Sequence, residues 1–188
     1  MKIKNKIQII VLGNSYVGKT CFILRFKDNN FSEEYMPTFG KEKYFKTIKI
    51  NNREYNICIS DTNGNEKYRE KTINKLKFFD GIILVYDITN KKSIEDNHFW
   101  IQQIIENIGD KFPFIICANK CELKNKKNIS ISEVEEYTKK YSIPFFEINN
   151  KDGININKAF SELIDQIIYI KERDELGKKS KLEKYYSF

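Results

Sequence analysis

An eight-residue segment bounded by glycines, Gly13–Thr20, constrains this chain more than any other part of its sequence. It reads G-N-S-Y-V-G-K-T and follows an apolar run at residues 7–12. The spacing G-x-x-x-x-G-K-[ST] between a strand and a helix turns successive backbone N–H groups toward one point, where the helix N-terminus adds partial positive charge. Lys19 then reaches the β- and γ-phosphates, and the Thr20 hydroxyl takes a Mg²⁺ position. The segment therefore predicts a phosphate-binding loop rather than a chance glycine turn.

Length and composition are those of a single globular domain. The 188 residues are 40% hydrophobic, and no run approaches the ~18 apolar residues of a membrane-spanning helix. The cysteines show no paired metal-ligand spacing, so we expect reduced thiols. A net charge of +7 raises nucleic acid as a partner, but the lysines are spread along every segment, which is typical of a solvated surface. We expect no nucleic acid partner and keep a nucleic-acid binder as the alternative from another class.

The order of predicted elements indicates an α/β fold. Apolar runs and alternating patterns predict strands at 6–12, 43–50, 53–60, 81–86, 112–118 and 144–148, and helices at 18–27, 66–78, 94–108, 134–141 and 156–176. The dipeptide Asn51-Asn52 predicts a tight hairpin turn, and Ser130–Glu133 a capping box before the fourth helix. We expect a P-loop fold: a mostly parallel six-stranded sheet with one antiparallel edge hairpin strand and helices on both faces. The domain covers residues 1–175, a basic tail follows at 176–188, and the Lys-rich segment 171–188 is expected to fray.

Four further segments fall at the ends of predicted strands, in chain order. They are Phe31–Gly40, Asp61–Glu66, Asn119–Glu122 and Ile148–Lys151. Together with the loop they resemble the Ras superfamily of small GTPases, and Phe79–Thr89 is most similar to the Rab branch. The resemblance implies a guanine-nucleotide-binding switch that holds GTP or GDP with Mg²⁺. It places the phosphates on the loop residues Asn14, Ser15, Tyr16, Val17, Gly18, Lys19, Thr20 and Cys21. The bulky Tyr16 shades the γ-phosphate, contacts a regulator or faces solvent.

The resemblance also assigns the two switch segments. Thr38 matches the switch threonine that reaches Mg²⁺, and with Thr20 and Asp61 it completes the implied metal ligands. Phe31 matches the aromatic residue beside the guanine, with a plain core phenylalanine as the alternative. Gly64 matches the glycine that offers its backbone N–H to the γ-phosphate.

Switch II departs from the family pattern D-T-A-G-Q-E at two positions. Asn63 replaces a small alanine near the phosphates, and Asn65 replaces the glutamine that orients the attacking water. The resemblance thus implies two catalytic residues, Asn65 and Lys19. Asparagine is one methylene shorter than glutamine, and a misplacement of about 1 Å costs on the order of a hundredfold in rate. We therefore expect slow hydrolysis, and the alternative is a GTP-binding scaffold that does not hydrolyse GTP.

Base recognition is assigned to two segments that follow the fifth and sixth predicted strands. Glu122 stands for the aspartate that accepts guanine N1–H and its 2-amino group, and a carboxylate disfavours adenine, whose N1 has a lone pair. The alternatives are lax base selection, with Glu122 turned to solvent, and an ATPase or phosphotransferase. The remaining implied base and loop contacts come from Asn119, Lys120, Asn149, Asn150 and Lys151.

The resemblance names partners and a location as well. It implies effector, exchange-factor and activating proteins that bind through Phe31–Gly40 and Asp61–Phe78, in vesicle trafficking or signalling. Rab proteins ordinarily end in prenylated cysteines, whereas no cysteine follows Cys121 here. We therefore expect a cytoplasmic protein that meets endomembranes only weakly, through its C-terminal lysines, or through a partner protein.

Overall fold

The computed structural model is built around one six-stranded sheet, and it describes residues 5–32, 42–109, 111–126, 134 and 138–186. The strand order is β2-β3-β1-β4-β5-β6, with β2 alone antiparallel to its neighbour. The bounds are β1 Lys6–Leu12, β2 Lys43–Ile50, β3 Arg53–Ser60, β4 Gly81–Asp87, β5 Phe114–Asn119 and β6 Phe145–Glu147. The predicted fold class and edge hairpin are confirmed. In such a sheet the loops after β1, β3, β5 and β6 meet at one edge.

The hairpin turn forms where the sequence predicts it. Asn51 and Asn52 both have positive φ, 49° and 62°, which is the type I′ geometry that matches the twist of two antiparallel strands. Asparagine adopts this left-handed region more readily than most residues, so the dipeptide sets the register that opposes Ile50 and Arg53.

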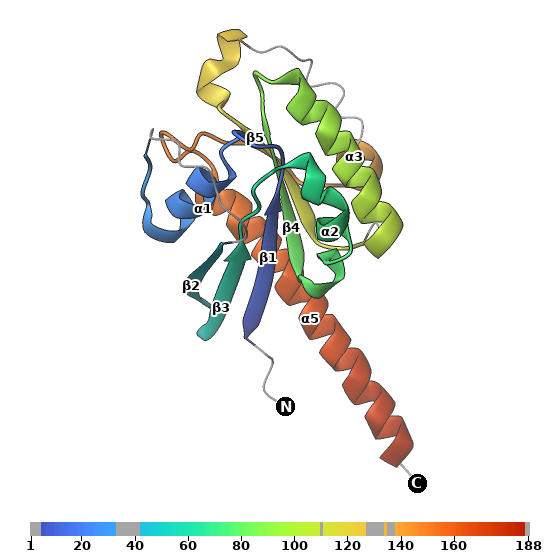
Figure 1. Cartoon of the computed structure of the whole chain (residues 1–188). Helices are drawn as coiled ribbons and strands as arrows, with labels where there is room; N and C mark the ends of the chain where they lie inside the picture. Colours follow the sequence, from blue (N-terminus) through green and yellow to red (C-terminus); the bar gives the residue numbers. More distant parts are fainter. Residues whose placement is uncertain (1–4, 33–41, 110, 127–133, 135–137, 187–188) are drawn as a thin grey trace.

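Helices cover both faces of the sheet (Figure 1). On one face α1, Lys19–Asp28, packs with α5, Ile156–Tyr186, and the rings of Phe26 and Phe160 stack with centroids 3.8 Å apart. On the other face α3, Lys91–Ile108, packs through Trp100, Ile101 and Ile104. Because both faces are covered, β4 is buried along its whole length, as its continuous apolar run predicts.

The predicted helix over 66–78 is wrong as a single element. The segment forms a 3-10 turn, Glu66–Tyr68, then α2, Arg69–Ile73, and a second 3-10 turn, Leu76–Phe78. Among the side chains of these helical turns that the structure describes, only those of Thr72 and Leu76 are buried, so little apolar surface is available to hold one continuous helix. By contrast, α3 begins three residues before the predicted start, because the side chain of Asn90 accepts a hydrogen bond from the Ser93 N–H and caps the helix.

The last helix is longer than predicted. It continues from Ile156 to Tyr186 and projects beyond the rest of the domain, whereas the sequence predicts an end at Leu176 and a frayed tail (Figure 1). The residues after Leu176 include four lysines and one glutamate, which are good helix formers, and no proline. The division into residues 1–175 and 176–188 stays a prediction. The capping box Ser130–Glu133 lies outside the described residues, as do positions 135–137 of the helix predicted after it, whereas its described residues, 134 and 138–141, are helical.

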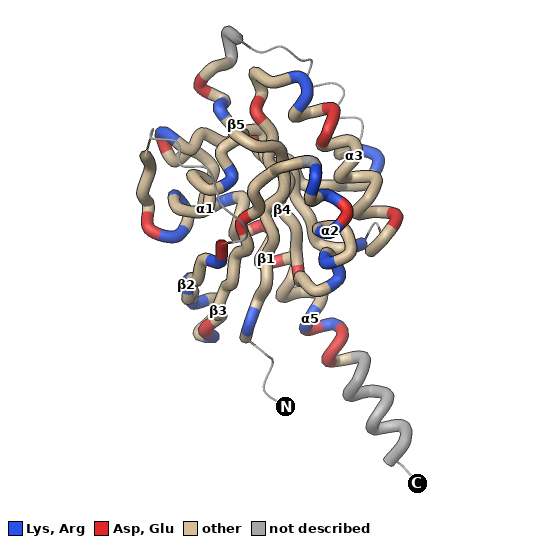
Figure 2. Tube along the Cα trace, in the orientation of Figure 1, with Lys and Arg blue, Asp and Glu red and all other residues tan. Residues whose placement is uncertain are grey.

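The positions of the charged residues, the apolar segments and the cysteines can be compared with what the composition predicts. Lysine and arginine are scattered over helices, strands and loops rather than gathered on one element (Figure 2). None of the helices in the described part of the chain is long and apolar enough to cross a membrane. All four cysteines, Cys21, Cys58, Cys117 and Cys121, are free thiols.

Candidate functional site

A pocket of about 500 Å³ opens at the edge of the sheet where the predicted loops meet. Its lining brings together most of the predicted site residues: Tyr16, Gly18, Lys19, Thr20, Cys21, Phe31, Asn119, Lys120, Glu122, Asn150 and Lys151. The lining also includes Asn63, which the sequence analysis places near the phosphates, and four residues that it did not assign there: Leu24, Asn30, Ser32 and Thr62. Asn14, Ser15, Val17, Asp61, Gly64 and Asn149 are not lining residues. Thr38 lies outside the described residues.

The loop after β1 has a backbone that its glycines make possible. A Cβ on Gly13 would stand 2.1 Å from the carbonyl oxygen of Val85, so no side chain fits there. Gly18, at φ 93°, precedes the first residue of α1 and leaves the N-terminus of that helix facing the pocket. Tyr16 adopts φ 68° and is 67% exposed, so its ring lies at the rim of the pocket.

Lys19 is a buried cation at the floor of the pocket. Its side chain is only 5% exposed, and Nζ donates a hydrogen bond to the backbone oxygen of Asn14 at 2.6 Å. Burial lowers the pKa of Lys19 to about 8, although the nearby carboxylate of Asp61 acts in the opposite direction. Because burial disfavours the Lys19 charge more than Asp61 favours it, an anion in this pocket would gain strongly from Lys19.

Two hard oxygen donors meet next to this lysine. The Thr20 hydroxyl donates to Oδ2 of Asp61 at 2.5 Å, and Asp61 is fully buried at the end of β3. Hydroxyl and carboxylate oxygens are the ligands that Mg²⁺ prefers, and Mg²⁺ is ordinarily held by one or two such groups together with phosphate oxygens. Within the described residues no cluster of three or more His, Cys, Asp or Glu side chains could hold a metal alone. The pair therefore fits a magnesium ion that arrives with a phosphate ligand.

The segment after β3 packs directly against the phosphate loop. A Cβ on Gly64 would stand 2.4 Å from the Ser15 nitrogen and 2.6 Å from Nζ of Lys19, so only glycine fits this approach. The Ser15 hydroxyl donates to the backbone oxygen of Asn63 at 3.0 Å. The side-chain amide of Asn14 is turned the other way and donates to Asp96 on α3.

The two asparagines of this segment are engaged with its backbone. Oδ1 of Asn63 accepts the Asn65 N–H at 3.1 Å, and Oδ1 of Asn65 accepts the Lys67 N–H at 3.0 Å. Each side chain thus closes a local turn two residues long, a common use of asparagine. In this arrangement the side-chain oxygen Oδ1 of Asn65 already accepts the Lys67 N–H, and Asn65 does not line the pocket.

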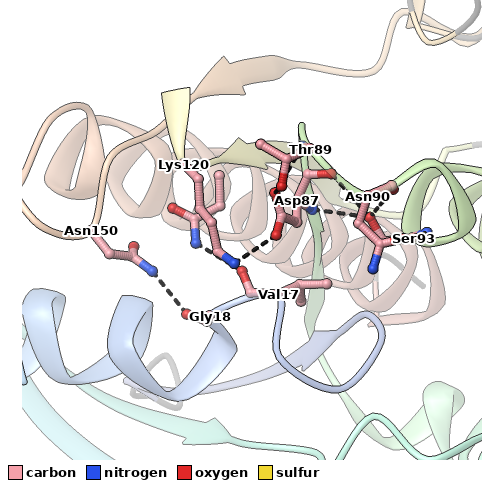
Figure 3. Close-up of polar contacts among 9 residues, drawn as sticks. Val17, Gly18, Asp87, Thr89, Asn90, Ser93, Lys120 and Asn150 are labelled. Carbon is pink, nitrogen blue, oxygen red and sulfur yellow. Dashed lines mark hydrogen bonds and ion pairs between the residues drawn. The ribbon is translucent and has the colours of Figure 1, made fainter. Parts of the chain in front are cut away.

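Two amide side chains brace the phosphate loop from the opposite wall (Figure 3). Nδ2 of Asn119 donates to the Val17 oxygen at 2.7 Å, and Nδ2 of Asn150 donates to the Gly18 oxygen at 2.9 Å. Oδ1 of Asn119 and Oδ1 of Asn150 are both buried and have no hydrogen-bond partner among the residues that the structure describes. Such buried acceptors call for a donor, and a ligand with N–H groups in the pocket would supply one.

The remaining predicted base-binding residues divide into two groups. Glu122 is exposed and, like Lys151, contributes to the pocket wall. Asn149 is 1% exposed, and its side chain bonds to Asp152 rather than to the pocket: Nδ2 donates to Oδ2 of Asp152 at 2.6 Å, and Oδ1 accepts the Asp152 N–H at 3.0 Å. Asn149 therefore shapes the turn that carries Asn150 and Lys151.

Arg25 on α1 is a residue that the sequence analysis missed. Its Nε donates to the Asn150 oxygen at 2.9 Å, a second guanidinium nitrogen donates to the Lys151 oxygen, and the guanidinium lies 5.4 Å from the centre of the Phe31 ring. Arg25 thus ties the loop after β6 to α1 and to the aromatic wall of the pocket. These partners lie up to 126 positions away in the sequence, so no local pattern points to this role.

We expect Arg25→Lys to speed about tenfold the release of the guanine nucleotide that the sequence predicts, because a single ammonium nitrogen does not match the two-nitrogen fork that reaches both carbonyls and each charge-assisted bond is worth about 1.5–3 kcal/mol. Dissociation of a fluorescent guanine nucleotide measures the effect. Arg53→Lys is the matched control, since Arg53 pairs with Glu172 at 2.9 Å on the exposed surface, away from the pocket. Equal rates for the wild type and Arg25→Lys would contradict this role.

Comparison with known proteins gives matches along most of the chain. A Ras family model matches residues 8–169, which include every residue that lines the pocket. "Ras-related protein Rab-13" of Rattus norvegicus is 34% identical over 161 residues, 86% of this chain and 79% of the relative. "Ras-related protein Rab-10" of Diplobatis ommata is 34% identical over 170 residues, 89% and 85% of the two chains. "GTP-binding protein YPTM1" of Zea mays is 30% identical over 177 residues, 94% and 83%.

Proposed function

The chain belongs to the Ras family and is a Rab-like small GTPase by sequence, and from this membership we propose that it is a guanine-nucleotide-binding switch. The single observation that carries the proposal is the pocket itself, which joins a buried lysine, a helix N-terminus and the Thr20–Asp61 oxygen pair at one end. Its other end holds the buried amide oxygens of Asn119 and Asn150 and the carboxylate of Glu122. The first end suits phosphates and the second a purine base.

Each residue at the phosphate end has a role in this proposal. Lys19 and the backbone N–H groups of the loop bind the phosphates, while Thr20 and Asp61, together with Thr38, would hold Mg²⁺. The metal ion would neutralise charge on the phosphate oxygens. Gly64 lies next to Lys19, so its N–H is within reach of a third phosphate, and this contact would make the segment after β3 sensitive to the triphosphate.

At the base end the proposed preference is for guanine over adenine. A carboxylate at Glu122 accepts two N–H groups from guanine, whereas adenine presents a lone pair at the same place. Phe31, backed by the guanidinium of Arg25, would cover one side of the base. Lys120 and Lys151 would flank the nucleotide from the loops after β5 and β6.

Competition binding tests the proposed nucleotide. With a fluorescent GDP bound in Mg²⁺, unlabelled GDP and GTP should displace it at least a hundredfold more effectively than ADP and ATP, because a mismatched polar base site leaves buried groups unpaired. Stronger displacement by ADP and ATP than by GDP and GTP would favour the ATPase or phosphotransferase alternative. Nucleotide that binds without base preference would instead show that Glu122 does not read the base.

We expect Glu122→Asp to strengthen GDP binding about tenfold, since imperfect geometry of one polar contact costs on the order of 1–3 kcal/mol. The shorter side chain restores the aspartate of the family pattern. Its carboxylate then meets the guanine edge directly, whereas the longer glutamate side chain has to fold back to do so. Titration of the fluorescent GDP gives the dissociation constant. Glu54→Asp is the control, because Glu54 is exposed on β3 and away from the pocket. A weaker complex for Glu122→Asp would show that the pocket is built for the longer arm.

A second candidate function is a hydrolysis-deficient GTP-binding scaffold, and the local hydrogen bonds of Asn63 and Asn65 favour it. With Oδ1 of Asn65 bonded to the backbone of Lys67, this side chain would have to leave its turn before it could orient a water molecule. We propose that the chain hydrolyses GTP slowly; the scaffold is the extreme case, in which the hydrolysis rate is zero. A single-turnover measurement of bound GTP distinguishes a slow enzyme from an inert binder.

Partners and location follow from the same proposal. Effector, exchange-factor and activating proteins would bind over Phe31–Gly40 and Asp61–Phe78, where Tyr68 and Phe78 are 50% and 65% exposed. Exposed aromatic residues of this size suit a protein interface. We propose a role in vesicle trafficking or signalling, in the cytoplasm and at the surface of endomembranes, without a nucleic acid partner.

A further inference from the structure

Asp87, the last residue of β4, is a nearly buried carboxylate beside the pocket (Figure 3). Its side chain is 8% exposed, and Oδ2 forms an ion pair with Nζ of Lys120 at 2.6 Å. Oδ1 accepts two hydrogen bonds from Thr89, one from the backbone N–H at 2.8 Å and one from the hydroxyl at 2.7 Å. These contacts hold the carboxylate in one orientation, aimed at the end of β5.

Lys120 follows β5 directly and has an unusual backbone. Asp87 pairs with Asn119 in the parallel register of β4 and β5, so Lys120 is the next residue at the same edge of the sheet. Its φ is 65°, in the left-handed region that residues with a side chain seldom adopt. The side chain lines the pocket, whereas Asp87 does not. Any effect of Asp87 on a bound nucleotide must therefore pass through its neighbours.

We infer that Asp87 is a positioning residue for nucleotide binding, which fixes the Lys120 side chain along the wall of the pocket. This inference rests on the proposed function. The Lys120 side chain is 33% exposed, so without the carboxylate its ammonium group gains more by turning to water, and its methylene stem leaves the place where it would flank the nucleotide. Thr89 contributes by keeping Asp87 aimed at Lys120. The pocket thus depends on a residue that does not line it.

A purely structural tie between β4 and β5 is the competing explanation, and a second ion pair on the same strand gives its control. Asp80, just before β4, accepts the Gln8 N–H at 2.7 Å and pairs with Lys171 at 2.8 Å. Asp80 and Asp87 therefore have similar partners, one backbone N–H and one lysine, at opposite ends of one strand. Only Asp87 has a lysine that lines the pocket.

The test is a double-mutant cycle on dissociation of a fluorescent GDP from the full chain in Mg²⁺, with Asp87→Asn, Lys120→Met and the double variant. Asp87→Asn should raise the dissociation rate about tenfold, the scale of one charge-assisted contact, and should add nothing in the Lys120→Met background. Asp80→Asn should leave the rate unchanged within about twofold, even where it lowers the melting temperature.

Three results would overturn the inference: an unchanged rate for Asp87→Asn, an equal rise for Asp80→Asn, or a full tenfold rise that persists without Lys120. Should Asp87→Asn not fold, Thr89→Val replaces it, with an expected rise of about threefold that also disappears in the Lys120→Met background. Wild-type protein that binds no fluorescent GDP would refute the proposed function itself, which separates the two failures.

Discussion

Replacing Lys19 by methionine should weaken GDP binding by at least about a hundredfold. The ammonium group would form charge-assisted hydrogen bonds to two phosphates, each worth about 1.5–3 kcal/mol. Methionine keeps most of the buried volume, and burial already works against the charge, as the lowered pKa of Lys19 shows. The nucleotide-free variant should therefore keep its melting temperature while losing the stabilisation that added GDP gives the wild type.

Lys46→Met is the matched control for this change. Lys46 also donates to a backbone oxygen, that of Phe26, and its ammonium group lies 4.3 Å from the centre of the Phe26 ring, outside the pocket lining. This variant should bind GDP like the wild type. A Lys19→Met protein that retains GDP within a factor of about five would show that the phosphates lie elsewhere, because that factor is below the worth of one charged hydrogen bond.

The double substitution Asn63→Ala with Asn65→Gln should accelerate GTP hydrolysis on the order of a hundredfold. Glutamine reaches one methylene further than Asn65, and alanine removes the Asn63 side chain that now accepts the Asn65 N–H. The water-orienting amide would then be free of the local turn that holds Oδ1 of Asn65. Single-turnover conversion of bound GTP to GDP, followed by chromatography, measures the rate.

Two controls isolate this effect. Asn65→Ala removes the amide without adding reach and should not accelerate hydrolysis, and Asn74→Gln changes an asparagine at the end of α2, outside the pocket lining. Both proteins should retain GTP as long as the wild type does. Ordinary turnover by the wild-type chain, at a rate that the double substitution does not increase, would show that another group orients the water.

Much of the fold could be predicted from local patterns. The apolar run of β4 and the Asn51-Asn52 turn determine a buried strand and a type I′ hairpin almost by themselves, because burial on both faces and positive φ each demand particular residues. The broken segment Glu66–Phe78 could not be predicted in this way. Its helical periodicity is present, but the surface buried against α3 and the sheet is too small to keep one helix.

The candidate site shows the same division. The glycines of the phosphate loop and the polar residues at strand ends were predictable, because their spacing follows from the geometry of the loop and the sheet. The contacts of Arg25, Asp87 and the Asn150 side chain were not, since each depends on a partner brought close only by the fold. The side chain of Asn149 likewise lies against Asp152 for a reason visible only in the folded turn.

The measurement that tests the central claim most directly is the identity of the nucleotide held by the purified chain. Protein is exchanged in EDTA with an equimolar mixture of GDP and ADP, returned to Mg²⁺, desalted and denatured, and the released nucleotide is identified by chromatography. We predict close to one guanine nucleotide per chain and only traces of adenine. Recovery of adenine nucleotide in equal or greater amount, or of no nucleotide at all, would contradict the account.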